Sequence, residues 1–523
     1  MWAKGLAAGG LATCALLGVA YALSQVAVVS FFPLDIAQAG IRLMPGAIAT
    51  QGIEALGAGA KLLAEASALV LVLLVGAAAG GVAARFGLQR SWSNVLPLAA
   101  VAIALIAAAQ TLAGTLPDAI SLGGTAVLIV GWAAVLLGVV RQITPTAASM
   151  ARPASPARRH FLRLSAFVLL AVGAGGGVIG ELLRRSQEAA LAQAIARGDP
   201  VPGVPLPTDA SPAFPVADPS FQPGLGTRPE ATPPPALYIV SSEVRSPNVD
   251  ATVWRLAVGG LVNSPFSLSY AELRSLDRVD QPSTLTCISN EVGGGLTGTG
   301  VWSGVPLRTL LDRAGVSTAA STLVVRSVTG YSDSIPLPLA LDPRTLVVYG
   351  FGDQALGREH GFPARLIIPG LYGMKNVKWL SGIDLVDQSY VGYWEQRGWD
   401  PSGAVRTEST IDTGNPSLGN GNSIRSQNGQ VVLGGYAFAG NRGVSAVELN
   451  IDNAGWQSVQ LKEPFSDITW RAWRYAWQAT PGDHVVTARA TDGTGVVQSA
   501  ESLPPHPSGA SGWHTLNLRV QGS

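Results

Sequence analysis

Cysteine is nearly absent from this chain of 523 residues, which has only Cys14 and Cys287. Cys14 lies within an apolar run and Cys287 lies far away in a polar region, so a disulfide framework is excluded. Histidine is also scarce, with five residues, and only His160 lies near an apolar segment. Haem within a membrane bundle needs axial ligands there, so we expect no haem. Without a second cysteine or a Cys/His cluster around Cys287, we expect no zinc and no iron–sulfur cluster.

Charged residues are also scarce in this sequence. Charged residues make up 13% of the chain and the formal net charge is +1. A nearly neutral chain without a basic excess gives no reason to expect a nucleic-acid partner. The hydrophobic fraction of 47% instead predicts segments that lie in membrane lipid.

Five apolar stretches in the first part of the chain are about long enough to span a hydrocarbon core, which takes roughly 20 residues. Alanine and glycine are abundant in all of them, as suits close packing of helices in lipid. The stretches are Leu6–Ser30, Leu62–Ala84, Val95–Leu112, Leu122–Val140 and Phe161–Ile179.

Basic residues in the loops predict the orientation of these spans, because such loops remain in the cytoplasm. Arg85 and Arg90 follow the second span, whereas the loop between the third and fourth carries only Asp118. The sequence therefore predicts a multi-pass protein of the cell membrane with a cytoplasmic N-terminus and an extracytoplasmic C-terminal part. More arginines cluster between the fourth and fifth spans: Arg141, Arg152, Arg158, Arg159 and Arg163.

The approach to the fifth span contains Arg158-Arg159-His160-Phe161-Leu162-Arg163. This segment resembles a twin-arginine export signal, which serves proteins that fold before they cross the membrane. The alternative is an ordinary membrane anchor with two adjacent arginines on its cytoplasmic side.

Composition divides the chain into four parts. Residues 1–185 form the predicted membrane region, and residues 186–236 form a linker in which proline recurs from Pro200 to Pro235. Such a segment is typically an extended spacer. We expect an α+β domain in residues 237–410 and a β-sandwich of immunoglobulin-like type in residues 411–523.

Local patterns predict the elements of these two domains. Ser269 and Glu272 form a capping-box signature that begins a short helix, and Pro306–Ala314 predicts a second helix that ends at Gly315. Alternating and branched residues predict mostly antiparallel strands at Val253–Val262, Leu323–Val328, Thr345–Tyr349, Arg365–Ile368 and Val377–Val386. The expected strands of the sandwich are Gly434–Ala439, Val444–Ile451, Trp456–Leu461, Thr469–Gln478 and His484–Thr491.

Cys287 follows an apolar run and precedes a glycine-rich stretch, Gly293–Gly295. A lone cysteine is often a small buried hydrophobic residue. The end of a strand that opens onto a glycine-rich loop can also present a thiolate to a soft or high-valent metal. Because no other cysteine is near, a metal bound here would take its remaining ligands from a cofactor.

A second pattern, in residues 357–379, alternates basic residues with glycines. Arginine and lysine beside glycine-rich backbone can hold a phosphate-bearing ligand. The alternative is a basic hairpin on the surface. The residues that carry the pattern are Arg358, His360, Arg365, Lys375 and Lys378.

Several ordered motifs from about Leu237 to Asp400 resemble the sulfite oxidase family of molybdopterin-dependent oxidoreductases. The region after them resembles that family's dimerisation domain, with Trp456 and residues 489–493. The motifs are Thr286-Cys287-Ile288-Ser289-Asn290, residues 302–307, Gly330-Tyr331-Ser332, His360-Gly361-Phe362-Pro363-Ala364-Arg365 and Val377-Lys378-Trp379.

The resemblance implies an enzyme that binds a molybdenum–molybdopterin cofactor and catalyses oxygen-atom or two-electron transfer on a small substrate. It implies that Cys287 binds the molybdenum. It also implies that the pterin and its phosphate are held by Ile239, Val240, Ser241, Ser242, Glu243, His360, Arg365, Asn376, Val377 and Lys378. The metal performs the redox change, and the protein supplies orientation and electrostatics.

Two departures from the family pattern concern the substrate. Ser241 stands where sulfite oxidases place an arginine for the anionic substrate, and Trp399 replaces a tyrosine. Glu243 adds a negative charge that would repel sulfite. These departures argue against sulfite and leave open a neutral sulfoxide, another oxygen-atom acceptor or another substrate that the enzyme reduces. They also leave open a protein that binds the cofactor but has lost catalysis.

The resemblance also implies partners. No haem-domain motif is present, so we expect a separate electron carrier. The C-terminal domain makes a homodimer possible, and the spans imply contact with membrane lipid.

Overall fold

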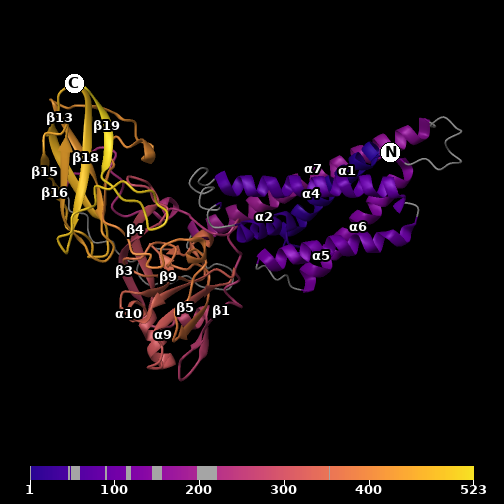
Figure 1. Cartoon of the computed structure of the whole chain (residues 1–523), viewed down its shortest axis with the longest axis horizontal. Helices are drawn as coiled ribbons and strands as arrows, with labels where there is room; N and C mark the ends of the chain where they lie inside the picture. The colour runs from indigo at the N-terminus through magenta and orange to yellow at the C-terminus, as the bar shows by residue number, and fades with distance from the viewer. Residues whose placement is uncertain are drawn as a thin grey trace. The chain divides into compact units, whose positions relative to one another are not determined.

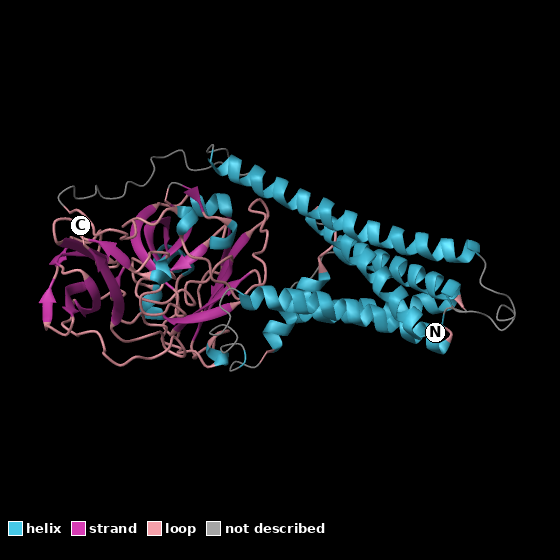
Figure 2. Ribbon diagram, turned by 90° about the horizontal axis from the view of Figure 1, so that it is seen from above, coloured by secondary structure: helices cyan, strands magenta, loops and turns pink. Residues whose placement is uncertain are grey.

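The computed structural model describes residues 2–26, 28–44, 48, 59–88, 91–113, 119–143, 156–196, 221–352 and 354–522. Contacts divide the chain into two units, the first of residues 1–197 with 243–245 and the second of residues 198–242 with 246–523. Figures 1 and 2 show the helices of the first unit and the β-sheets of the second. The predicted export signal lies at the start of α7, where the side chains of Arg158 and Arg159 are not described. Most of the predicted proline-rich linker also lies outside the described residues.

The first unit is a helix bundle. Five of its helices are long and apolar enough to cross a membrane, in agreement with the five predicted spans. The short α2 was not predicted as a separate helix; it is amphipathic, with Pro33 in its first turn and Asp35 and Gln38 among its buried residues. The helices are α1 (Trp2–Gln25), α2 (Phe32–Leu43), α4 (Gly59–Phe86), α5 (Val95–Ala113), α6 (Ala119–Ile143) and α7 (Pro156–Ala196).

Glycine permits the close contact between α1 and its neighbours that the composition predicted. A Cβ atom on Gly9 would collide with the carbonyl oxygen of Gly76 in α4, and one on Gly18 would collide with that of Gly173 in α7. Backbones that approach this closely gain van der Waals contact, which stabilises helix association in lipid.

The second unit begins with two sheets that form the α+β part. One has the order β2-β1-β10-β5-β6, and the other has the order β3-β4-β7-β8 with β9 beside β7. All pairings are antiparallel as predicted, except that β1 runs parallel to β10. The strands are β1 (Arg255–Gly260), β2 (Phe266–Ser269), β3 (Val279–Thr286), β4 (Thr297–Pro306), β5 (Thr322–Ser327), β6 (Ser332–Pro336), β7 (Leu346–Phe351), β8 (Gln354–Ala355), β9 (Arg365–Ile367) and β10 (Leu380–Val386).

Two predicted helices of this part are confirmed. The capping box of Ser269 and Glu272 begins α8 (Tyr270–Arg274). The helix α9 (Leu307–Ala314) ends at Gly315, whose φ of 69° is left-handed, and Pro306 is its N-cap. A third short helix is α10 (Leu337–Ala340).

Residues 408–521 form two further sheets, of order β11-β13-β17-β16 and β12-β19-β18-β14-β15. Their inner faces share one core, to which Leu433, Trp473, Val447 and Leu518 contribute. The strands are β11 (Glu408–Ile411), β12 (Ser423–Arg425), β13 (Gln430–Phe438), β14 (Val444–Ile451), β15 (Trp456–Ser458), β16 (Gln460–Leu461), β17 (Arg471–Gln478), β18 (Gly482–Asp492) and β19 (His514–Gln521).

The prediction of one strand at Trp456–Leu461 was wrong. β15 pairs with β14 in one sheet and β16 pairs with β17 in the other, so the chain passes between the sheets within this segment. Period-2 alternation cannot reveal such a crossing, because both halves alternate equally well.

Candidate cofactor site

Cys287 lies immediately after β3, at the start of the loop that leads into β4. Its amide donates to the carbonyl of Leu296 at 2.9 Å, and its own carbonyl accepts from the amide of Asn290 at 3.0 Å. The loop therefore closes on itself and holds Cys287 in place. The residue is 5% exposed, so its thiol lies in a buried environment.

Burial raises the pKa of the Cys287 thiol, and hydrogen bonds from Ser289 together with the positive charge of Lys378 partly oppose that rise. A buried thiol of this kind remains protonated at neutral pH. Coordination to a metal ion would deprotonate it. The hydrogen bonds from Ser289 and the positive charge of Lys378 both favour the thiolate form, which is the form that binds a metal.

The basic hairpin lies directly beside Cys287. The amide of Gly373 donates to the carbonyl of Thr286 at 2.8 Å. A Cβ atom on Gly373 would lie 2.8 Å from the Tyr238 hydroxyl and 3.9 Å from the Cys287 Cα. Only a residue without a side chain lets these three parts meet. The structure thus brings together Cys287, the hairpin and the segment that begins at Leu237.

Two basic side chains of the hairpin, Lys378 and Arg365, lie against Gly361. A Cβ on Gly361 would lie 3.0 Å from the Cβ of Lys378 and 3.1 Å from that of Arg365. The Lys378 ammonium donates at 2.9 Å to the carbonyls of both Val240 and Glu359. Lys378 therefore joins the hairpin to the predicted cofactor segment Ile239–Glu243.

Arg365 is 4% exposed, and two of its guanidinium nitrogens donate to the carbonyls of His360 at 3.2 Å and Asn376 at 3.1 Å. Its Nε is buried and has no partner among the described residues. Burial lowers the pKa of Arg365 to about 10, so it stays charged at neutral pH. Burial, with the positive charges of Arg365 and Lys378, lowers the pKa of His360 to about 4, so its ring is neutral.

These residues fit a pterin that carries a phosphate. A buried guanidinium with an unused donor calls for an acceptor oxygen, because unsatisfied buried donors are rare. Charge-assisted bonds to phosphate are among the strongest such contacts. The neutral ring of His360 can both donate and accept a hydrogen bond.

The other predicted site residues are not among the basic side chains beside Gly361. The Asn376 amide donates to the carbonyls of Leu371 and Tyr372 and accepts from the amide of Ile368, so it supports the hairpin from within. Val377 is 1% exposed, whereas Ile239 and Val240 are exposed and Ser241 and Ser242 are half-buried.

Glu243 belongs to the first unit. Its carboxylate lies 3.7 Å from the Arg42 guanidinium, and its carbonyl accepts from the Lys61 ammonium at 2.7 Å. Its role as a cofactor contact stays a prediction.

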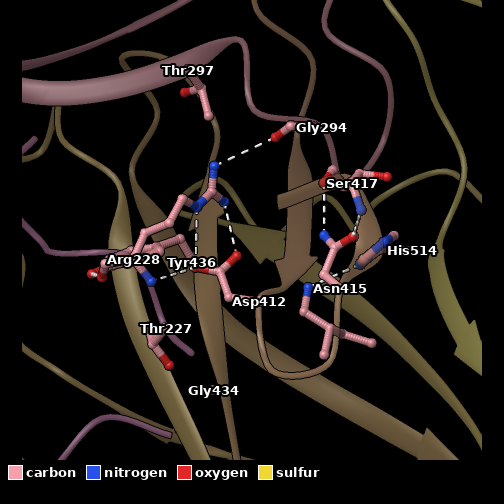
Figure 3. Close-up of polar contacts among 12 residues, drawn as sticks. Thr227, Arg228, Gly294, Thr297, Asp412, Asn415, Ser417, Gly434, Tyr436 and His514 are labelled. Atoms are coloured by element: carbon pink, nitrogen blue, oxygen red, sulfur yellow. Dashed lines mark hydrogen bonds and ion pairs between the residues drawn. The ribbon is translucent and has the colours of Figure 1, made fainter. Parts of the chain in front are cut away.

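The glycine-rich stretch after Cys287 packs against the C-terminal sheets. A Cβ on Gly293, where φ is 81°, would collide with the His514 ring. The Asn415 amide donates to the Gly293 carbonyl at 2.8 Å, and Arg228 donates to that of Gly294 at 3.4 Å (Figure 3). The glycines therefore permit close packing rather than mobility of the loop.

Several residues near the site were not predicted as site residues. Tyr238 lies against Gly373, and burial raises the pKa of its hydroxyl well above the usual value. Lys375 is buried with Asp333 and Glu395. Glu408 approaches Asn290 from β11. Lys375 was noted only as part of the basic pattern, and no local pattern marks the others, because their partners are remote in sequence.

Replacing Gly361 with alanine should weaken cofactor retention. The new methyl group would lie 3.0–3.1 Å from Lys378 and Arg365, and the residue has a φ of 109° that L-residues rarely adopt. Such strain costs on the order of 1–3 kcal/mol. We expect lower molybdenum content per protein and a lower unfolding midpoint. Gly357→Ala, where the nearest atom would be 3.4 Å away, is the control. Equal molybdenum content in Gly361→Ala and wild type would contradict the placement of the cofactor beside Gly361.

Comparison with known proteins gives a consistent family assignment. The family model described as "Oxidoreductase molybdopterin binding domain" matches residues 243–394. An uncharacterized oxidoreductase of Bacillus subtilis, YuiH, is 32% identical over 154 residues, which are 29% of this chain and 76% of that protein.

Two further relatives match over different lengths. Human mitochondrial sulfite oxidase is 28% identical over 57% of this chain, which spans 63% of that protein's own length. A putative protein-methionine-sulfoxide reductase subunit of Azospira oryzae, YedZ1, is 33% identical over 31% of this chain and 60% of its own length.

Proposed function

Because this chain belongs to the sulfite oxidase-like molybdopterin-dependent oxidoreductases, we propose that it is a membrane-anchored enzyme that transfers oxygen atoms to or from a small substrate outside the cytoplasm. The observation that carries the proposal is the convergence of Cys287, the Arg365–Lys378 hairpin and Tyr238 around Gly373 and Gly361. The five apolar helices support the membrane anchor.

Each residue of the site has a proposed role. Cys287 provides the thiolate ligand of molybdenum. Arg365 and Lys378 bind the phosphate of the pterin, and the neutral His360 donates a hydrogen bond to it. The bound cofactor supplies a centre that accepts or releases two electrons. The main chain of Val240, Ser241 and Ser242 borders the pterin, and Asn376 keeps the hairpin in shape.

We infer that the substrate is a neutral sulfoxide-like compound. Ser241 cannot attract an anion as an arginine would. Trp399 is 4% exposed and its indole Nε1 is buried without a partner in the described chain. The relative named as a putative protein-methionine-sulfoxide reductase subunit supports this substrate class.

The remaining organisation is proposed from the composition of the chain and from the resemblance of its second part to the family. We propose a membrane region of residues 1–185, a linker of residues 186–236, a cofactor domain of residues 237–410 and an immunoglobulin-like dimerisation domain of residues 411–523. A separate electron carrier exchanges electrons with the cofactor, and the twin-arginine pathway exports the folded domain.

Purified full-length protein, produced with a full supply of molybdenum cofactor, tests the proposal. We expect about one molybdenum atom per chain by elemental analysis, since Cys287 offers one thiolate ligand. Paired assays then compare dimethyl sulfoxide reduction by reduced benzyl viologen with sulfite oxidation by ferricyanide. We expect turnover of the sulfoxide and little of sulfite. Protein without molybdenum would refute the proposed function, and faster sulfite turnover would refute the substrate class.

A further inference from the structure

Trp399 and His506 each have a buried ring nitrogen without a hydrogen-bond partner among the described residues. The two atoms are Nε1 of Trp399 and Nε2 of His506. Trp399 as a whole is 4% exposed, so solvent does not reach its indole. Because buried polar atoms are nearly always paired in folded proteins, two unpaired nitrogens in one place mark a position suited to a ligand.

The two rings form a pair, in which their centroids are 5.0 Å apart and their planes are nearly perpendicular, at 87°. The segments that carry them are also joined, since the Asp400 amide donates to the Pro507 carbonyl at 3.0 Å. A Cβ atom on Gly398 would lie 3.6 Å from the His506 Nε2. Main-chain contact on both sides therefore holds the Trp399–His506 pair together.

Main-chain hydrogen bonds connect this ring pair to the segment that holds Cys287. The Tyr372 amide donates at 2.7 Å to the carbonyl of Gly403, in the loop that follows the tryptophan. The residue after Tyr372 donates at 2.8 Å to the carbonyl of the residue before Cys287. On the histidine side, a Cβ atom on Gly509 would collide with the Tyr372 hydroxyl. Both loops of the ring pair therefore pack against Tyr372, which lies beside the segment of Cys287.

Apolar side chains surround the tryptophan. Trp399 belongs to a buried cluster with Met374, Val405 and Ile288, the residue after Cys287. Sites for small molecules typically combine such apolar walls with a few polar groups that fix the orientation of the ligand. An anion would lose more hydration than a neutral molecule on entering these surroundings, so they favour a neutral ligand.

We propose that Trp399 and His506 form the subsite that binds the oxygen atom of the sulfoxide substrate. The inference rests on the proposed function, whose substrate class it makes specific. The indole N–H of Trp399 donates to the sulfoxide oxygen, and His506 donates to the same oxygen in the tautomer that carries its proton on Nε2. The apolar groups on the sulfur pack against the cluster around Trp399. The C-terminal domain thus contributes a binding residue to the site.

Phenylalanine variants test the subsite in the full-length enzyme with its cofactor. Trp399→Phe and His506→Phe each keep an aromatic ring and remove one nitrogen donor. With reduced benzyl viologen as electron donor, we expect the KM for dimethyl sulfoxide to rise about tenfold in each, while kcat stays within about twofold. The inhibition constant of dimethyl sulfide, which has no oxygen, should not change. Lost packing would instead weaken the binding of both compounds.

The double variant shows whether the two nitrogens bind one group. Its KM should rise by less than the product of the two single increases, because both donors share one oxygen. Trp473→Phe is the matched control, since its buried Nε1 also has no partner in the described chain but lies in the core of the β-sandwich. We expect it to keep the KM of wild type.

Three kinetic outcomes would overturn the subsite. An unchanged KM in both single variants would mean that the two nitrogens bind water only. A KM for dimethyl sulfoxide that rises together with the inhibition constant of dimethyl sulfide would mean lost packing. Independent effects in the double variant would mean that the two rings do not share a ligand.

Thermal unfolding of the oxidised protein gives a readout without turnover. A ligand stabilises the state that it binds. Relative to each protein's own midpoint without ligand, dimethyl sulfoxide should therefore raise the midpoint of wild type more than that of Trp399→Phe, and solvent effects common to both cancel. Equal shifts at every concentration would overturn the subsite. Wild type without molybdenum, or without sulfoxide turnover, would instead refute the proposed function, and the difference in midpoint shift can still be measured, so the two failures are distinguishable.

Discussion

Replacing Cys287 with serine should reduce turnover by about 10³-fold or more, equivalent to about 4 kcal/mol of transition-state stabilisation. A serine hydroxyl is far less readily deprotonated than a thiol and lacks the soft, polarisable sulfur, so it replaces a thiolate ligand poorly. The fold should persist, because the side chains have nearly the same volume and the loop is held by main-chain hydrogen bonds of Cys287 and Asn290.

The chain provides its own control for this experiment. Cys14 lies in α1, within the first unit, and Cys14→Ser should leave both turnover and molybdenum content unchanged. Turnover and molybdenum should be measured on the same preparations of the two variants. Full activity in Cys287→Ser would remove the ligand assignment.

Replacing Lys375 with methionine should destabilise the second unit by about 3–5 kcal/mol, because it leaves buried carboxylates without their cation. The ammonium lies 2.7 Å from Asp333 and also contacts Glu395, and the lysine is 2% exposed. Burial already raises the pKa of Asp333 to about 6, and the loss of Lys375 would raise it further. We expect the thermal unfolding midpoint of the full chain to fall by roughly 10 °C.

The triple variant Lys375→Met, Asp333→Asn, Glu395→Gln distinguishes the lost ion pair from lost packing. Once the carboxylates are neutral, no buried charge is left uncompensated, so much of the stability should return. Lys375 lies beside Asn376 in the hairpin, and the Tyr331 hydroxyl approaches both Asp333 and the Met374 carbonyl. Molybdenum retention should therefore change in parallel with the unfolding midpoint. If the unfolding midpoint of the triple variant is no higher than that of Lys375→Met, lost packing of the lysine side chain explains the destabilisation instead.

Local signals in the sequence predicted much of the fold. The spans depend on unbroken apolar runs, and the capping box of α8 and the αL glycine that ends α9 depend on residues within one or two turns. The strand limits were less accurate, as for β10, which begins at Leu380 rather than Val377. Trp379 has a φ of 53°, a conformation that ends regular strand geometry and is unusual for a bulky residue.

The candidate site stays a prediction. The sequence proposed Cys287 and the basic hairpin from the order of their motifs, and the structure places these segments side by side through Gly373. Glu408 and the carboxylate partners of Lys375 were not proposed, because a buried carboxyl group has the same local sequence as an exposed one. What distinguishes them is burial and the identity of remote partners such as Arg228 and Asn290.

The sequence alone determined that the chain has an apolar helical half, a single thiol in its polar half and a basic hairpin, since each of these depends on composition or short spacing. Only the tertiary structure decided which groups are buried without a charge partner and which glycines let separate segments meet. Burial and close contact arise between residues as far as 240 positions apart, as for Glu230 and Trp470, so no local pattern encodes them.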